Sequence, residues 1–230
     1  MTDAISSLPI LRRDAHFTIA GYQRFRKVID EDGALPAHLK ALLAAVAASA
    51  RRFPELAARE LARGADQGLK VDDAKAGVIV LSSLRGEGAA SEFAGLLDRT
   101  FGPVEDRGEP QAVSVAEGEA RANFESYFGT VPPALEVMLR TIPIAADGYY
   151  LMRRGSIDAN PLSPKAGELL LLVVLAADHS PMAQRHVEGA RRAGASDAEI
   201  AETIICAIPS GGIAAWMAAA PYLAPARDDA

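Results

Sequence analysis

The sequence predicts an all-α protein made of two tandem helical repeats that pack against each other. Half of the 230 residues are hydrophobic but only 6% are aromatic. Such an alanine-rich composition favours closely packed helices over a sandwich of β-branched strands. Proline, glycine and serine residues mark helix starts and ends along the chain. Two long stretches carry these marks at matching intervals, which is typical of a duplicated unit.

The clearest helices lie within residues 162–216. Ser163 followed by Pro164 predicts a helix start, because serine caps a helix and proline is tolerated at its first position. Ser180 followed by Pro181 predicts a second helix, which runs to Gly194. A serine followed three residues later by glutamate predicts a third helix that begins at residue 196 and ends before residue 209. A fourth helix is expected over 213–222.

The earlier part of the chain is expected to be helical as well, after a loosely held arm at residues 1–16. The apolar run at 78–81 could be taken for a strand, but its length and its flanking residues favour a helix. The remaining predicted helices cover residues 18–30, 35–52, 55–67, 72–84, 89–100, 115–128, 132–140 and 144–154.

The proline and glycine residues that mark helix ends occur at matching positions in the two halves of the chain. The interval from residue 35 to residue 54 equals that from 162 to 181, and glycines follow in the same order in both halves. We therefore predict an N-terminal repeat at 1–101, a linker at 102–113 rich in proline, glycine and charge, and a C-terminal repeat at 114–230. The alternative is that alanine-rich helical hairpins resemble one another through composition alone.

Charge and cysteine content exclude several classes of protein. With 24 basic and 30 acidic residues, the net charge is −6, which argues against nucleic acid as a partner. The single cysteine, Cys206, rules out an intramolecular disulfide and fits a reducing compartment. No stretch resembles a signal peptide or a membrane span. The expected location is the cytoplasm, with no membrane partner.

The stretch at 162–202 resembles the carboxymuconolactone decarboxylase family, which includes the alkylhydroperoxidase D proteins. The matching segments are Leu162-Ser163-Pro164-Lys165, Glu168-Leu169, His186-Val187, Gly189-Ala190, Gly194-Ala195-Ser196, Glu199-Ile200 and Glu202. This resemblance implies an all-helical fold, a small acidic molecule or a peroxide as substrate, and a homo-oligomer, here a trimer or dimer. It does not by itself choose the reaction.

His186 and Glu168 are the catalytic candidates, because they occupy the family's histidine and glutamate positions. A histidine titrates near neutral pH and can give or take a proton. A carboxylate in an otherwise apolar helix is costly unless it has a partner or a function. The alternatives are a surface histidine beside charged neighbours, and a solvent-facing glutamate favoured by the helix dipole.

Other side chains are candidates for binding substrate. His179 and Met182 lie near the two cysteine positions of the peroxidase branch. This chain lacks both cysteines, so thiol peroxidase chemistry is not expected. Ordinary packing or a surface position is the alternative for every substrate-binding candidate: His179, Met182, Tyr149, Tyr150, Arg153 and Trp216. We expect no resident metal, although His179, His186 and Glu168 could form a metal site if the helix junction brought them together.

Two functions remain open from the sequence. The first is a cofactor-free lyase or isomerase that resembles carboxymuconolactone decarboxylase and acts on a small carboxylated lactone or ring acid. Its proton would be handled by His186, with Glu168 as relay. The second is a non-catalytic helical oligomer that binds a small ligand. The N-terminal repeat has no histidine at the corresponding position, where Arg59 or Glu60 stands, so it is expected to act as scaffold.

Overall fold

The computed structural model of the chain describes residues 4–105, 108–109 and 111–223. Within these residues the chain forms helices and turns without any β-strand, which confirms the all-α prediction. None of the described helices is both long and apolar enough to cross a bilayer. The helices of the first half are α1 (Ala4–Ser7), α2 (Pro9–Asp14), α3 (His16–Asp30), α4 (Ala37–Ala50), α5 (Pro54–Asp66), α6 (Val71–Arg85) and α7 (Glu87–Phe101).

The second half begins after a segment without regular structure. Its helices are α8 (Glu119–Phe128), α9 (Pro133–Thr141), α10 (Pro143–Ser156), α11 (Pro164–Ala177), α12 (Ala183–Arg192), α13 (Asp197–Cys206), α14 (Ile208–Gly211) and α15 (Ile213–Ala219), and a 3₁₀ turn follows at Ala220–Leu223.

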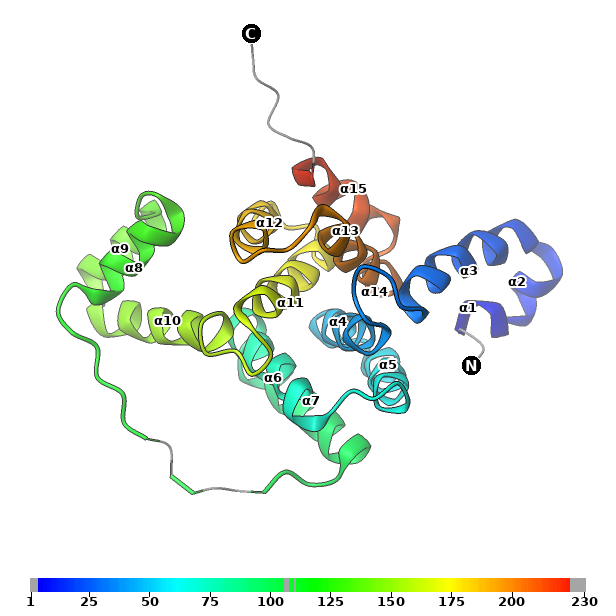
Figure 1. The fold of residues 1–230 in the computed structure, drawn as a ribbon, viewed down its shortest axis with the longest axis horizontal. Coiled ribbons are helices and arrows are strands. Elements are labelled where there is room, and N and C mark those ends of the chain that lie inside the picture. The colour runs from blue at the N-terminus through cyan, green and yellow to red at the C-terminus, as the bar shows by residue number, and fades with distance from the viewer. Residues whose placement is uncertain (1–3, 106–107, 110, 224–230) are drawn as a thin grey trace, which may run out of the picture.

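Helices α4 and α11 lie side by side in the middle of the molecule (Figure 1). Nearly every residue of both is buried, because both are apolar all round rather than on one face. Helices α5, α6 and α7 cover one side of this pair, and α12, α13 and α15 cover the other. The alanines of α4 let the neighbouring helices approach closely, since a methyl group is the smallest side chain that still fills space.

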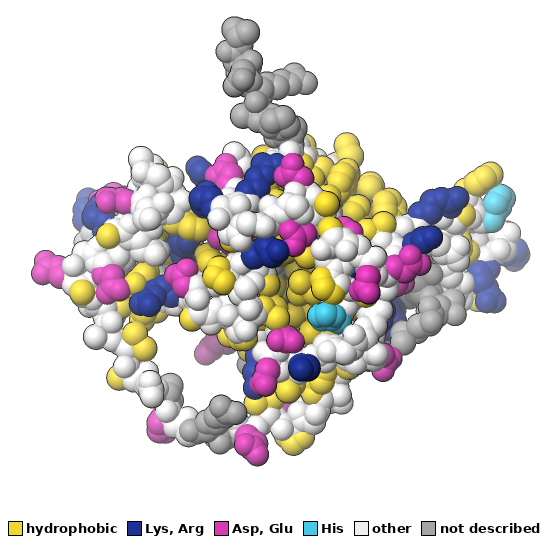
Figure 2. Space-filling view, in the orientation of Figure 1, with side chains coloured by type: hydrophobic (Ala, Val, Ile, Leu, Met, Phe, Trp, Pro, Cys, Tyr) yellow, Lys and Arg dark blue, Asp and Glu magenta, His cyan; other side chains and the backbone are white. Residues whose placement is uncertain are grey.

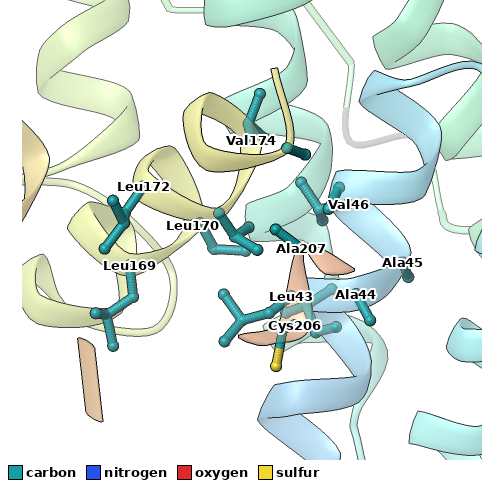
Figure 3. Packing of buried hydrophobic residues seen from close by; sticks show 14 of the residues in the cluster. Leu43, Ala44, Ala45, Val46, Leu169, Leu170, Leu172, Val174, Cys206 and Ala207 are labelled. Carbon is teal, nitrogen blue, oxygen red and sulfur yellow. The ribbon is translucent and has the colours of Figure 1, made fainter. Parts of the chain in front are cut away.

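The contact between the two central helices is a dry apolar layer. Leu43 and Val46 of α4 meet Leu170 of α11 there, with Ala207 beside them (Figure 3). Leu169 and Leu172 lie on the opposite side of α11. Both halves of the chain therefore contribute to one continuous core.

Two of the predicted helix starts are confirmed in atomic detail. The Ser163 hydroxyl accepts a hydrogen bond from the Ala166 N–H, with Pro164 at the first helical position. At α13, Ser196 and Glu199 form the reciprocal capping box that their spacing predicts. Each cap satisfies N–H groups that a helix start leaves without a partner.

The predicted start of the second helix at Pro181 is wrong. Helix α12 begins at Ala183, and residues 181–182 form a turn before it. His179 has a positive φ of 57°, which turns the chain sharply after α11. The Ser180 hydroxyl then accepts the N–H of Met182 rather than one inside the helix.

Other helix limits differ from the predictions at the ends. Residues 4–14 of the expected arm form the short helices α1 and α2, while residues 1–3 lie outside the described part. Helix α8 starts at Glu119 instead of residue 115, because Gly118 adopts a left-handed conformation and the Glu119 carboxylate accepts the Ala116 N–H. The last helix ends at Ala219 and tightens into the 3₁₀ turn.

Helices α8, α9 and α10 form a separate layer on one flank, reached by the long segment after α7 (Figure 1). They share a small core of their own around Ala120, Phe124, Ala146 and Tyr150. Helix α10 also packs on α6 and α11. This arrangement brings the C-terminal end of α8 against α11 and α12.

A buried ionic cluster ties α3 to α5. Glu60 is 1% exposed, and its carboxylate accepts hydrogen bonds from Arg26 at 2.9 Å and from Arg63 at 2.9 Å and 3.0 Å. Asp30 adds a second carboxylate to Arg26. Burial alone would lower the pKa of Arg26, but the charges and hydrogen bonds of Glu60 and Asp30 outweigh it and raise that pKa.

We predict that Glu60→Gln destabilises the protein by about 3 kcal/mol, because the change leaves two buried guanidiniums without their shared carboxylate. The amide keeps the shape of the side chain, so the effect reports the charge. Urea unfolding followed by circular dichroism measures it. The matched control is Glu136→Gln, which removes an exposed carboxylate paired with Arg121 and should change stability far less. Equal effects in the two variants would contradict the prediction.

Candidate active site

Three side chains from three helices meet at the flank where α8 covers α11 and α12. His186 Nδ1 lies 2.7 Å from Glu168 Oε2. The Tyr127 hydroxyl donates to the same carboxylate, at 3.1 Å from Oε1 and 3.2 Å from Oε2. The hydroxyl also lies 3.4 Å from His186 Nδ1. The carboxylate is thus the common acceptor of the group.

Glu168 is buried because α11 is central and α12 packs tightly over it. The residue is only 2% exposed and lies in the second turn of α11, where the other residues from Ala166 onward are apolar. Gly189 of α12 makes room for its carboxyl group, since a Cβ on that glycine would lie 2.5 Å from Glu168 Oε1. A buried carboxylate needs hydrogen-bond donors to offset its desolvation. Tyr127 and His186 supply them.

The geometry determines how the imidazole presents its two nitrogens. The Nδ1–H group donates to the carboxylate, so Nε2 is left as the nitrogen that can accept or give a proton. The His186 side chain is 13% exposed, compared with 3% for Glu168. The ring is therefore enclosed but retains an accessible edge. Orientation of a histidine by a buried carboxylate is the arrangement that general acid–base catalysis uses.

Two arginines flank the tyrosine ring. The guanidinium carbon of Arg153 from α10 lies 3.9 Å from the ring centroid of Tyr127, and that of Arg192 from α12 lies 5.3 Å away. Burial raises the pKa of Tyr127, and the charge of Glu168 raises it further, while the charge of Arg153 acts in the opposite direction. The phenol therefore stays protonated and acts as a donor to the carboxylate.

The sequence of this region matches a known family. Residues 143–225, which include both catalytic candidates, match the sequence model of the Carboxymuconolactone decarboxylase family. Over these residues the chain is similar to that family. The resemblance found in the sequence is thus confirmed for α10 to α15. A search of curated proteins found no match to the chain.

Most of the predicted substrate-binding residues have partners other than His186 and Glu168. His179 Nε2 lies 3.0 Å from the Gly211 carbonyl oxygen, and Met182 is exposed. Trp216 is partly buried against the main core. The Tyr150 hydroxyl donates to Glu119 at 2.5 Å, and Tyr149 packs against the ring of Phe124.

Among the predicted substrate-binding residues, the described contacts bring only Arg153 to the group formed by Tyr127, Glu168 and His186, which we call the triad. The other five are distributed between the junction after α11, the main core and the small core of α8–α10. Helices that are consecutive along the chain can present their side chains to different neighbours.

Sequence reasoning missed Tyr127 and Arg192. Tyr127 is the penultimate residue of α8, forty-one positions before Glu168, and its role depends on how α8 docks. Arg192 lies at the end of α12, where a basic residue also suits the helix dipole, so its type and position carried no specific signal.

The described residues offer no metal site and no reactive thiol beside these groups. No group of three or more His, Cys, Asp or Glu side chains there is arranged to hold a metal ion. Cys206 is fully buried, and burial raises the pKa of its thiol to about 12. A thiol that stays protonated at neutral pH is a poor nucleophile.

Three cavities of about 450 to 490 Å³ are lined by residues of the first half together with Pro209. They lie at the turn between α4 and α5, beside the start of α7, and beside residues 101–105. None of these three borders His186 or Glu168.

We predict an effect of pH on stability that arises from the half-buried phenol of Tyr127. The pKa of Tyr127 is raised in the folded protein from an ordinary value of about 10. The folded state therefore holds this proton more tightly than the unfolded state. Its contribution to stability is complete below about pH 10 and is lost as the pH rises above that value.

Urea unfolding at pH 8, 9, 10 and 11 should show a smaller loss of stability above about pH 10 for Tyr127→Phe than for the unaltered protein. The two proteins are compared by how steeply their free energy of unfolding changes with pH. The loss of the Tyr127 hydrogen bond lowers the stability of the variant at every pH and does not affect this comparison. Parallel curves for the two proteins would mean that Tyr127 ionises as freely in the folded state as in the unfolded state.

Proposed function

We propose that the protein is a lyase or isomerase that moves a proton on a small carboxylated lactone or related ring acid. The observation that carries this proposal is the buried Glu168 carboxylate, which holds Nδ1 of His186 at 2.7 Å and leaves Nε2 free. The match of residues 143–225 to the Carboxymuconolactone decarboxylase family supports this class of substrate. The proposal assigns His186 as proton donor and acceptor and Glu168 as its positioning partner.

A decarboxylation at this site would proceed by loss of CO₂ followed by proton transfer from His186. The bond between a ring carbon and the substrate carboxylate breaks, CO₂ leaves, and the electron pair spreads into the conjugated carbonyl of the ring. The proton on Nε2 of the imidazolium then passes to the carbon, and water returns a proton to the neutral imidazole. In an isomerisation, Nε2 takes a proton from one carbon and returns it to another.

Glu168 makes both reactions easier through charge. The carboxylate stabilises the imidazolium and keeps Nδ1 protonated, as the acidic partner of a catalytic histidine does in hydrolases. Tyr127 supports the carboxylate by donating to it. The buried position limits screening by water, so these interactions are stronger than on the surface.

Arg192 is the best candidate to hold the substrate carboxylate. It lies over the Tyr127 ring, next to the triad, and no described carboxylate forms an ion pair with it. Arg153 is more enclosed, with its guanidinium stacked on Tyr127 and Phe128. A planar guanidinium binds a carboxylate through two parallel hydrogen bonds, which would orient the ring for proton transfer.

We predict that His186→Gln reduces turnover of a carboxylactone by about 10²- to 10⁴-fold, the usual contribution of a general acid–base. Glu168→Gln should reduce kcat strongly with little change in KM, because the substrate does not contact it. Arg192→Ala should mainly raise KM. The assay follows loss of lactone absorbance and released CO₂ for the purified protein without added metal.

The control for this series is His16→Gln, an exposed histidine that belongs to another helix, and it should leave turnover unchanged. Full activity of His186→Gln would remove the basis of the proposal. Ligand binding without turnover across a panel of carboxylactones would instead favour the non-catalytic binding protein. If the protein reduced peroxide and Cys206→Ser abolished that activity, a thiol peroxidase would be favoured. The burial of the Cys206 thiol argues against this outcome.

We also propose that the chain arose by duplication, with a repeat in residues 1–101, a linker at 102–113 and a repeat in 114–230. Support comes from the backbone. Arg52 and His179, at φ of 62° and 57°, are the non-glycine residues with positive φ in the described part, and each follows a central helix. Gly68 and Gly194, and likewise Gly86 and Gly212, have positive φ at corresponding helix ends.

We further propose that the protein forms a homo-oligomer through α15. Its exposed face carries Ile213 and Met217, one helical turn apart, and Met217 is 68% exposed. Hydrophobic side chains gather on the surface where α15 lies (Figures 1 and 2). Exposed apolar patches on a small protein commonly mark contact surfaces.

We predict that Met217→Lys shifts the protein to a smaller assembly, because a buried lysine at the contact lacks a partner. Size-exclusion chromatography with light scattering measures the mass. Val113→Lys is the control, since Val113 is also exposed but lies outside the helices. An unchanged mass in Met217→Lys, or a monomer before any substitution, would exclude α15 as the contact.

A further inference from the structure

A cavity of about 480 Å³ lies between the end of α4 and the start of α7, away from the His186 triad. It is bordered by the C-terminal end of α4, the turn into α5, the last residue of α6 and the first turns of α7. The lining residues are Ser49, Ala50, Arg52, Pro54, Arg85, Gly88, Ala89 and Glu92. None of them takes part in the chemistry proposed above.

Positive charge predominates around this cavity. Arg52 and Arg85 line it, and Arg51, which precedes Arg52, lies close enough to Arg85 for their charges to interact. Asp178 from the end of α11 pairs with Arg85 and lies 3.7 Å from Arg51. Arg52 has no carboxylate partner among the described residues, and Glu92, which also lines the cavity, is exposed in α7. The arginines therefore outnumber the carboxylates that neutralise them.

Arg52 is held in an unusual backbone conformation. Its φ of 62° is in the left-handed region, which costs free energy for a residue with a side chain. Glycine would remove that cost at no loss to the turn. A positively charged residue kept at such a position, on the wall of a cavity, is consistent with a use for its side chain.

Ser49 supplies an independent observation. The residue is 2% exposed and borders the cavity, and its hydroxyl oxygen has no hydrogen-bond partner among the described residues. Buried hydroxyls elsewhere in the helices bond back to the preceding turn, as Ser156 does to the Met152 carbonyl. A buried hydroxyl without a partner is costly. A ligand in the cavity would complete it.

The start of α7 adds backbone donors to the same wall. Gly88 and Ala89 lie in the first turn, and no side chain caps this helix. The first N–H groups of a helix have no partner within it and favour an anion. Helix α7 has fifteen residues, so its dipole is fully developed.

We propose that this cavity binds the phosphate group of a small anionic ligand. A phosphate offers several acceptor oxygens, which match two guanidiniums, one hydroxyl and the N–H groups of the first turn. A carboxylate would leave part of these donors unused. The volume exceeds that of a phosphate ion, which leaves room for an organic body attached to it. The group could come from inorganic phosphate or from a phosphate monoester.

Isothermal titration calorimetry with inorganic phosphate, and separately with glycerol phosphate, tests the proposal at constant ionic strength set by chloride. Both titrations should show saturable binding. Tighter binding of glycerol phosphate would identify the monoester as the source, whereas equal affinity would identify the free ion. Arg52→Gly removes the guanidinium but keeps the turn, and we expect affinity at least about tenfold weaker, as for loss of one charge-assisted hydrogen bond.

Ser49→Ala separates a ligand group from a structural one. The change removes a hydroxyl without a partner, so the free protein should be as stable as before or more stable in thermal unfolding. At the same time the thermal stabilisation that phosphate produces should shrink. A merely structural serine would not give this opposite pair of effects. His186→Gln should leave phosphate binding unchanged, because the two sites share no residue.

Arg140→Ala is the control for loss of one positive charge, since Arg140 is exposed on α9 away from the cavity. An equal loss of affinity in Arg140→Ala and Arg52→Gly would show general attraction of anions and overturn the proposal. Unchanged binding in both Arg52→Gly and Ser49→Ala would overturn it as well. So would the absence of any heat or thermal protection at about 10 mM phosphate.

Discussion

The local structure of the candidate site depends on the burial of one carboxylate. Glu168 lies in a helix whose other residues from Ala166 onward are apolar, and it is covered by a neighbouring helix that approaches through Gly189. Desolvation of a carboxylate costs several kcal/mol unless donors compensate it. The two donors come from α12 and from α8, so the charge draws three helices together. The same constraint positions the imidazole, orients its nitrogens and keeps the phenol protonated.

The central pair α4 and α11 shows how one architecture can hold different chemistry. Gly64 packs toward Ala41 in the first half, much as Gly189 packs toward Glu168 in the second. Ala41 carries no charge, so no desolvation cost has to be offset at that position. The first half instead has its buried carboxylate in α5, where Glu60 binds Arg26 and Arg63. Ion pairs thus tie α3 to α5 within the first half, while the second half brings Glu168 together with His186 and Tyr127.

Much of the candidate site and the fold could be predicted from sequence because the relevant signals are local. Ser163 with Pro164, and Ser196 with Glu199, specify helix starts through contacts within one turn. Glu168 stood out because a carboxylate in an apolar helix needs a reason. By contrast, the start of α12 was misplaced, since the positive φ of His179 is decided by how the chain turns between packed helices.

By itself the sequence determined the all-α class and most of the helices, because helix periodicity and capping act over a few residues. The resemblance to the family pointed to His186 and Glu168 as candidates. Only the tertiary structure decided that Tyr127 and Arg192 join that pair, that Tyr150 pairs with Glu119 instead, and that Arg52, Arg85 and Ser49 border one cavity. These side chains lie far apart along the chain. Their meeting depends on how helices dock, which the packing of the whole core sets.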